Sequence, residues 1–205
     1  MKKVIETMRI LTVLTKPEEA LASEKKNAAI AKGVVPYAII GLVIGIPLGA
    51  VIALAATLFS TFFHAGAPLL GLGLSAIVVL PLVCLAVIVV ASLVGEGILF
   101  LFARLLGGRG SFAQQYYLSS LIVFPAAFLG FIGMLLGLIP FLGALASLAL
   151  SIYAFYLHVL AVKEAHGFSV LRAFAAVILP AAIVFFLVVL LLFAALASLL
   201  VGLAK

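Results

Sequence analysis

Three long stretches of this chain carry almost no charge, and they restrict the possible folds more than any other feature. Residues 33–103 contain one charged side chain, Glu96, and residues 110–162 and 173–204 contain none. About 20 apolar residues in a helix cross the hydrocarbon core of a bilayer, whereas a membrane barrel needs strands of alternating polarity. The stretches are apolar on all sides, which favours helices. Apolar residues make up 68% of the chain and charged residues only 9%, too few to cover a water-soluble domain. We therefore predict an all-α integral membrane protein.

Turn-forming residues divide the three stretches into five predicted transmembrane helices. The first stretch is interrupted at residues 61–68 and the second at residues 137–140, where glycine and proline gather. The third stretch is too short to cross a bilayer twice. The predicted spans cover residues 34–60, 69–105, 117–136, 141–162 and 173–203. Several are longer than a bilayer requires, so we expect tilted helices or helix ends that project from the membrane.

The basic residues predict the orientation of the chain in the membrane. With five spans, eleven of the twelve lysine and arginine residues lie on one side. The positive-inside rule places that side, with the N-terminus, in the cytosol and the C-terminus outside, in the cell membrane if the protein is prokaryotic. The net charge of +6 is accounted for in this way, so we expect no nucleic-acid partner. No cleavable signal peptide is expected, because a charged stretch of 32 residues precedes the first apolar run.

Residues 1–33 are predicted to form a cytosolic, amphipathic helical head. One stripe of the first helix is apolar, and it consists of Val4, Ile5, Met8, Leu11 and Leu14. A second helix is predicted to begin with Thr15 as its N-cap and Pro17 in its first turn, and to continue to about Lys32. The head would lie on anionic lipid headgroups or bind a cytosolic protein partner. Alternatively, it only orients the first span.

Small residues recur at four-residue spacing within the predicted spans and indicate close helix packing. The clearest examples are Gly41, Gly45, Gly49, Gly133 and Gly137. We favour packing within one chain, and the alternative is a homo-oligomer formed through the first span. Prolines lie in four spans and predict kinks; they are Pro36, Pro47, Pro81, Pro125 and Pro180.

Few polar residues could carry chemistry. Burying an acidic side chain within a membrane costs free energy, so an acid found there is a functional candidate. We predict a polar cluster near the cytosolic interface, with interfacial anchoring as the alternative; it comprises Glu96, Arg104, Tyr156 and His158. The chain has no aspartate, one cysteine and no histidine pair at metal-binding spacing. No catalytic motif is present, so we expect no enzyme, metal or cofactor.

Two predicted cytosolic loops carry the most distinctive sequences. The first is Gly107-Gly108-Arg109-Gly110-Ser111-Phe112, and the second includes Ala165-His166-Gly167-Phe168-Ser169 followed by Arg172-Ala173. With Lys16-Pro17-Glu18-Glu19-Ala20 in the head, these segments resemble the Yip-domain family of Ypt/Rab-interacting membrane proteins, in particular its short prokaryotic-type members. The resemblance implies a polytopic membrane protein without catalytic residues. Eukaryotic relatives have longer cytosolic N-terminal regions and bind prenylated Rab GTPases in early secretory membranes.

Two functions are therefore expected. The first is a non-enzymatic membrane-organising or adaptor protein that works through its cytosolic face, formed by the head and by loop residues Gly107, Gly108, Arg109, Gly110, Ser111, Phe112, His166 and Gly167. The alternative is a small transporter or lipid-permeation protein that uses the proline-kinked helices and Glu96. The lipid bilayer is the expected partner in both cases. A membrane-embedded enzyme would need a catalytic cluster deep in the bilayer.

Overall fold

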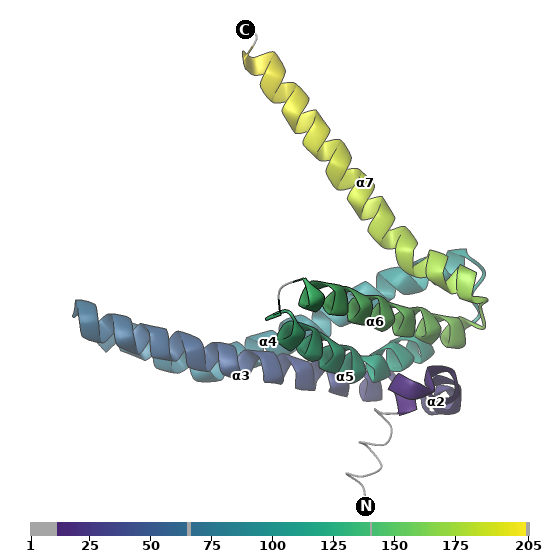
Figure 1. Ribbon diagram of the computed structural model, residues 1–205, viewed down its shortest axis with the longest axis horizontal. Helices are drawn as coiled ribbons and strands as arrows, with labels where there is room; N and C mark the ends of the chain where they lie inside the picture. The colour runs from purple at the N-terminus through teal and green to yellow at the C-terminus, as the bar shows by residue number, and fades with distance from the viewer. Residues whose placement is uncertain (1–11, 65–66, 140, 204–205) are drawn as a thin grey trace, which may run out of the picture.

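The computed structural model describes residues 12–64, 67–139 and 141–203, which form helices and short connections with no strand among them (Figure 1). Residues 12–15 are helical. The elements that follow are α2 (Pro17–Glu24), the 3₁₀ helix η1 (Lys25–Asn27), α3 (Ile30–Phe63), α4 (Ala67–Leu105), α5 (Phe112–Leu136), α6 (Leu142–His166) and α7 (Val170–Leu203). Five helices are long and apolar enough to cross a membrane, which confirms the predicted all-α membrane fold.

The spans are slightly longer than predicted, most clearly at the start of α5. This helix begins at Phe112 rather than at residue 117 because Ser111 and Gln114 form a capping box. The Ser111 hydroxyl accepts a hydrogen bond from the backbone N–H of Gln114 over 3.2 Å, and the Gln114 side chain accepts one from the backbone N–H of Ser111 over 3.0 Å. The backbone N–H groups of Ser111 and Gln114 are both satisfied in this way, and α5 begins about one turn earlier than predicted.

The head differs from the prediction at both ends of its second helix. Lys16, not Thr15, is the N-cap of α2, because a residue before proline is driven out of the helical region. The helix ends at Glu24, and the backbone is extended at Ala28 and Ala29 before α3 begins. The prediction of a single helix to Lys32 is therefore wrong. Most of the predicted amphipathic stripe lies outside the described residues.

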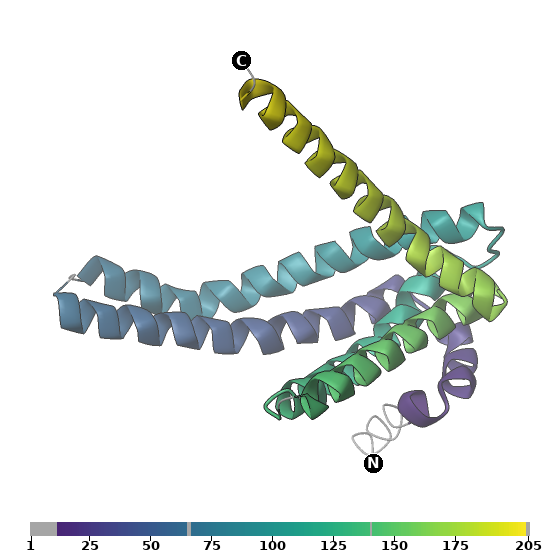
Figure 2. The same cartoon turned by 45° about the horizontal axis from the view of Figure 1, so that its top comes forward.

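Helices α3 and α4 form a long antiparallel hairpin and run side by side in both views (Figures 1 and 2). Glycines on α3 allow the two backbones to approach closely. A Cβ atom added to Gly41 would lie 2.5 Å from the Cα atom of Leu85, and one added to Gly45 would lie 2.5 Å from the Cα atom of Pro81. Gly49 faces α4 in the same way. The glycine stripe of α3 is thus covered by α4 of the same chain.

Helices α5 and α6 form a shorter hairpin of two 25-residue helices. At 1.5 Å per residue, each is about 37 Å long, whereas α3 and α4 exceed about 50 Å. In this hairpin the Ser147 hydroxyl donates to the backbone carbonyl of Gly133 over 2.8 Å. The two hairpins meet where Gly33 of α3 packs against Tyr116 of α5; a Cβ atom at Gly33 would lie 2.6 Å from the Tyr116 ring.

Helix α7 contacts the rest of the molecule mainly through its first turns. Ala173 and Ala176 are fully buried against α4 and α6. Beyond them, the helix leaves the other spans in both views (Figures 1 and 2). Its large side chains from Ile183 to Leu196 are mostly exposed and apolar. Lipid chains solvate such a surface well.

Candidate functional site

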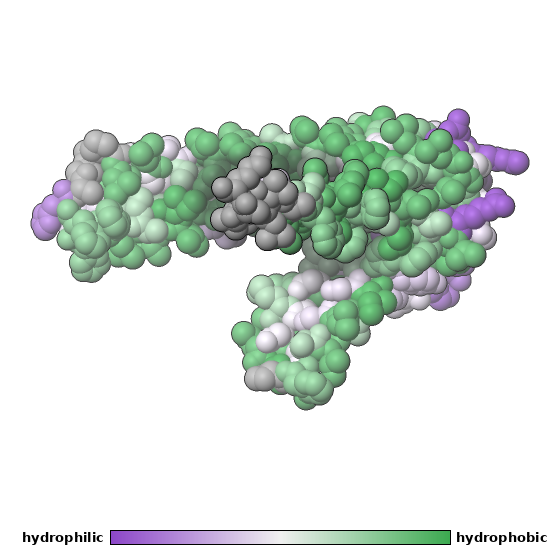
Figure 3. Space-filling view, turned by 90° about the horizontal axis from the view of Figure 1, so that it is seen from above, coloured by the Kyte–Doolittle hydropathy of each residue, from purple (hydrophilic) through white to green (hydrophobic). Residues whose placement is uncertain are grey.

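The polar parts of the protein gather at one end of the molecule. There α4 ends, α5 begins, α6 ends and α7 begins, and the head lies beside them (Figure 1). On the face drawn in Figure 3, the surface is hydrophobic over most of its area; most of the strongly hydrophilic atoms lie at this end, and a smaller hydrophilic patch lies at the opposite end. We call this end the loop face and define it as α2, η1 and residues 106–111 and 167–169. Its two loops are joined by a hydrogen bond of 3.4 Å from the backbone N–H of Arg109 to the carbonyl of His166.

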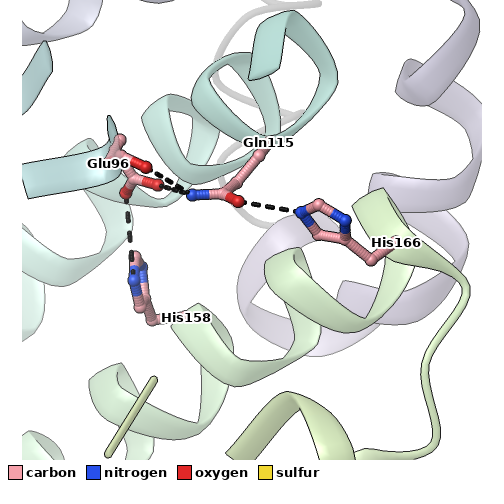
Figure 4. A network of polar contacts seen from close by, with 4 residues as sticks. All are labelled: Glu96, Gln115, His158 and His166. Atoms are coloured by element: carbon pink, nitrogen blue, oxygen red, sulfur yellow. Dashed lines mark hydrogen bonds and ion pairs between the residues drawn. The ribbon is translucent and has the colours of Figure 1, made fainter. Parts of the chain in front are cut away.

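Directly behind the loop face, Gln115 connects three helices through its side-chain amide (Figure 4). Its side chain is fully buried, and its Nε2 donates to the backbone carbonyl of Glu96 over 2.9 Å and to the Glu96 carboxylate over 2.7 Å. The amide oxygen of Gln115 lies 2.8 Å from Nε2 of His166. Because that oxygen can only accept, the His166 Nε2 carries the hydrogen and donates it. The Nδ1 atom of His166 is buried and has no hydrogen-bond partner among the described residues.

Glu96 has a second partner on α6. Nε2 of His158 lies 3.8 Å from the Glu96 carboxylate, which forms an ion pair when the imidazole is protonated (Figure 4). The Glu96 side chain is 7% exposed, whereas the His158 side chain is 31% exposed. An acid between membrane helices is tolerated when protein groups satisfy it. Glu96 is therefore held by α5 and α6 and joins them to its own helix, α4.

The other two residues of the predicted polar cluster lie elsewhere. Arg104 donates to the backbone carbonyl of Gly108 over 3.1 Å and places its guanidinium 5.9 Å from the centre of the Phe100 ring. Tyr156 is 41% exposed and lines a pocket between α6 and the head. The structure thus brings Glu96 and His158 together and separates Arg104 and Tyr156 from them.

Aromatic rings fix the position of the His166 imidazole. The Phe168 ring stacks on it at 5.4 Å between centroids, and the Phe100 ring lies at 5.7 Å. On the neighbouring helices, the Tyr116 hydroxyl forms a hydrogen bond of 2.9 Å with the Ser92 hydroxyl, and its ring packs against Tyr37. These contacts place aromatic rings around the buried polar groups.

The glycines of the two loops allow this close packing. A Cβ atom at Gly108 would lie 2.5 Å from Nδ1 of His166, and one at Gly110 would lie 2.3 Å from the carbonyl oxygen of Ala165. Gly107 and Gly167 have positive φ angles of 87° and 69°, which L-amino acids with side chains rarely adopt. The glycine-rich sequence therefore reflects loop-to-loop contact and tight turns at the helix ends.

The head is attached to α5 and α6 by specific contacts. Lys163 of α6 forms an ion pair of 2.7 Å with Glu18, and the Tyr117 hydroxyl donates to Glu24 over 2.9 Å. The Tyr153 hydroxyl also donates to the backbone carbonyl of Leu14. Leu21 is completely buried in a cluster with side chains of α5 and α6. The described part of the head therefore packs against the membrane helices of its own chain.

A pocket of about 530 Å³ opens between the head and the two loops. Three cationic residues line it, together with glycines, His166 and Gln114; the cations are Lys25, Arg109 and Arg172. The ammonium group of Lys25 donates to the backbone carbonyl of Glu164 over 2.5 Å. Among the residues that the structure describes, no carboxylate side chain lines this pocket.

Three residues of the site were not predicted as site residues from the sequence; they are Gln115, Lys25 and Arg172. For Gln115 a signal existed, because Gln114 and Gln115 are the only glutamines of the chain and lie in a charge-free stretch. Lys25 was counted only among the charges that set the orientation, and Arg172 was named besides only in the sequence that resembles the family. Across residues 12–64, 67–139 and 141–203, no group of three or more potential metal ligands occurs.

The family model of the Yip1 domain matches residues 11–202, which is nearly the whole chain. No curated protein and no solved structure matches the chain. The matched region includes the described head, both loops of the loop face and all five membrane helices.

Proposed function

The chain belongs to the Yip1 domain family, and we propose that it is a non-enzymatic membrane-organising or adaptor protein that binds protein partners through its loop face. It is an integral membrane protein with five helices able to span the bilayer. The proposal places the loop face and the N-terminus in the cytosol, in agreement with the one-sided distribution of basic residues.

The observation that carries this proposal is the attachment of the head to α5 and α6. Two polar contacts to different helices, Lys163 to Glu18 and Tyr117 to Glu24, combine with the buried side chain of Leu21. Lys25, directly after α2, lines the same pocket as both loops, so the head and the loops present one surface. A fixed surface of this kind suits protein binding, because little conformational entropy is lost on association.

The buried polar groups also favour an adaptor over an enzyme. Glu96, Gln115 and the Nε2 atom of His166 are engaged with one another between helices. They lie in a packed interior rather than in an open cleft, and such networks serve to fix helix positions. Their role in the proposed function is to hold the loops of the loop face in place.

Site-specific photo-crosslinking in native membranes tests the proposal. A crosslinking amino acid is placed at Glu19 or Ser169, both exposed on the loop face, and at His64 at the far end of the α3–α4 hairpin as a matched control. We expect crosslinked proteins at Glu19 and Ser169 but not at His64. A second copy of the chain in the crosslinked product would identify self-association. No product at either loop-face position would refute the proposal.

One observation favours the alternative of a transporter or lipid-permeation protein. The chain of polar side chains from His158 through Glu96 and Gln115 to His166 passes between helices and ends at a residue that lines the cationic pocket. Connected polar side chains of this kind serve as proton or ion pathways in transporters. Reconstitution in liposomes tests it: proton or lipid flux that disappears in Glu96→Gln would support transport, and no flux in the unchanged protein would exclude it.

A further inference from the structure

We propose that the pocket between the head and the two loops binds a phosphate group, with Lys25, Arg109 and Arg172 as its cationic ligands. The proposal concerns a ligand of the loop face and does not depend on the adaptor function, since partner binding and phosphate binding can each occur without the other. Three features of the pocket support a phosphate ligand: its charge, its volume and its position.

The charges of the pocket are unbalanced. Lys25, Arg109 and Arg172 come from three separate segments, η1, the α4–α5 loop and the first turn of α7. Within the described residues, none of the three forms an ion pair with a carboxylate. Lys163, near the C-terminal end of α6, differs from these three residues because it has two glutamate partners, Glu18 and Glu164. Cations brought together without acids repel one another, and a bound anion removes that repulsion.

The shape of the pocket suits a tetrahedral oxyanion. Its volume of about 530 Å³ holds a phosphate group with its substituent. Gly107, Gly110 and Gly167 line it, so no side chain from these positions blocks the approach to the backbone. Arginine binds phosphate oxygens with two parallel N–H groups, and two arginines line this pocket, one from the α4–α5 loop and one from the first turn of α7. His166 lines the wall as well.

The position of the pocket relates it to the membrane. It lies at the ends of α4 and α6 and at the starts of α5 and α7, where the apolar spans give way to polar loops. Lipid phosphates occupy this level of a bilayer, and basic pockets between membrane helices on the cytoplasmic side bind anionic headgroups. A soluble phosphate compound carries the same chemical group, so the experiment must separate these two sources.

The test compares two charge-matched double variants of the full-length protein in detergent. Arg109→Gln with Arg172→Gln removes two pocket cations that are both exposed, so neither change disturbs the core. Lys26→Gln with Lys32→Gln removes the same charge from exposed residues outside the pocket lining and serves as the control. Lys25 is left unchanged because its ammonium group also anchors the head to α6. Native mass spectrometry then measures binding of phosphatidic acid and of phosphatidylcholine, with inorganic phosphate as a competitor.

We expect phosphatidic acid to bind the unchanged protein more tightly than phosphatidylcholine. The arginine double variant should bind it about tenfold to thirtyfold more weakly, and the lysine double variant should stay within about twofold of the unchanged protein. Displacement by inorganic phosphate at similar concentration would support the site with a soluble phosphate as its source, and failure to compete would support a lipid headgroup. Equal binding by all three proteins, or equal weakening in both double variants, would overturn the proposal.

Discussion

The side-chain nitrogen of Gln115 donates to the Glu96 carboxylate over 2.7 Å in a position that is closed to solvent. This contact joins α5 to α4, and the amide oxygen of Gln115 continues the connection to His166 at the end of α6. One uncharged residue therefore determines how three membrane helices meet beneath the loop face.

Replacement of Gln115 by leucine should destabilise the protein by about 1–3 kcal/mol, because a buried carboxylate and a buried imidazole each lose a partner. The thermal unfolding midpoint in detergent measures the effect. Ser119→Ala is a matched control on the same helix: the Ser119 hydroxyl is buried and has no hydrogen-bond partner in the described part of the chain, so its removal should be neutral or slightly stabilising. Equal midpoints for Gln115→Leu and the unchanged protein would show that the amide contributes nothing.

Two substitutions of Glu96 should differ in their effect on stability. Glu96→Gln keeps a side-chain oxygen that can accept from Gln115, whereas Glu96→Leu leaves the Gln115 and His158 side chains without this partner. We expect Glu96→Leu to cost at least about 1 kcal/mol more than Glu96→Gln. Unfolding in detergent distinguishes the two, and a larger loss for Glu96→Gln would show that the charge, rather than the hydrogen bond, is required.

The close approach of α3 and α4 predicts a strong effect at Gly45. In Gly45→Val, the new side chain would collide with the backbone of Pro81, and we expect a loss of about 2 kcal/mol or more. Gly95→Ala is the control, because an added Cβ atom there meets nothing within 4 Å. That change should stabilise the helix by up to about 1 kcal/mol. Similar yields of folded protein for both variants would argue against the observed α3–α4 packing.

Attachment of the head can be measured by proteolysis. Leu21→Ala removes a completely buried side chain between the head and the α5–α6 hairpin, and such truncations cost about 2–5 kcal/mol when the site cannot collapse. Cleavage by trypsin at Lys25 and Lys26 should become faster by at least about tenfold. Ser23→Ala, on the exposed side of the same helix, should leave the rate unchanged. Rapid cleavage of the unchanged protein would show that the head is not held in place.

The proposed orientation predicts a simple labelling pattern. In a variant whose single cysteine, Cys84, is replaced by serine, new cysteines at Glu19 and His64 report on the two sides of the membrane. A membrane-impermeant thiol reagent applied to intact cells should label His64→Cys only, and Glu19→Cys should react after lysis. The reverse pattern would invert the orientation, and labelling of both in intact cells would show that α3 does not cross the membrane.

Some of the polar site could have been read from the sequence, and some could not. Glu96 is the lone charge in an apolar stretch, and Gln115 is one of two glutamines in a charge-free stretch, so both are visible as exceptions. That they bind each other is not visible, since 19 positions separate them and the helix rotation of α5 relative to α4 decides the contact. Lys25 and Arg172 are 147 positions apart in the chain. A count of basic residues predicts on which side of the membrane they lie, but not that they line the same pocket.

The amino-acid sequence alone determined the helical class, the five spans and the concentration of basic residues at the connections between them. These features follow from the transfer of each side chain between water and lipid, which depends on local composition and needs no partner. Only the tertiary structure decided which helix faces which, how the head docks and which polar groups meet. Lipid solvates an apolar helix surface about as well as another helix does, so hydropathy does not select neighbours. Close contact at glycines and a few buried hydrogen bonds make that selection, and both depend on how the helices are rotated and placed in three dimensions.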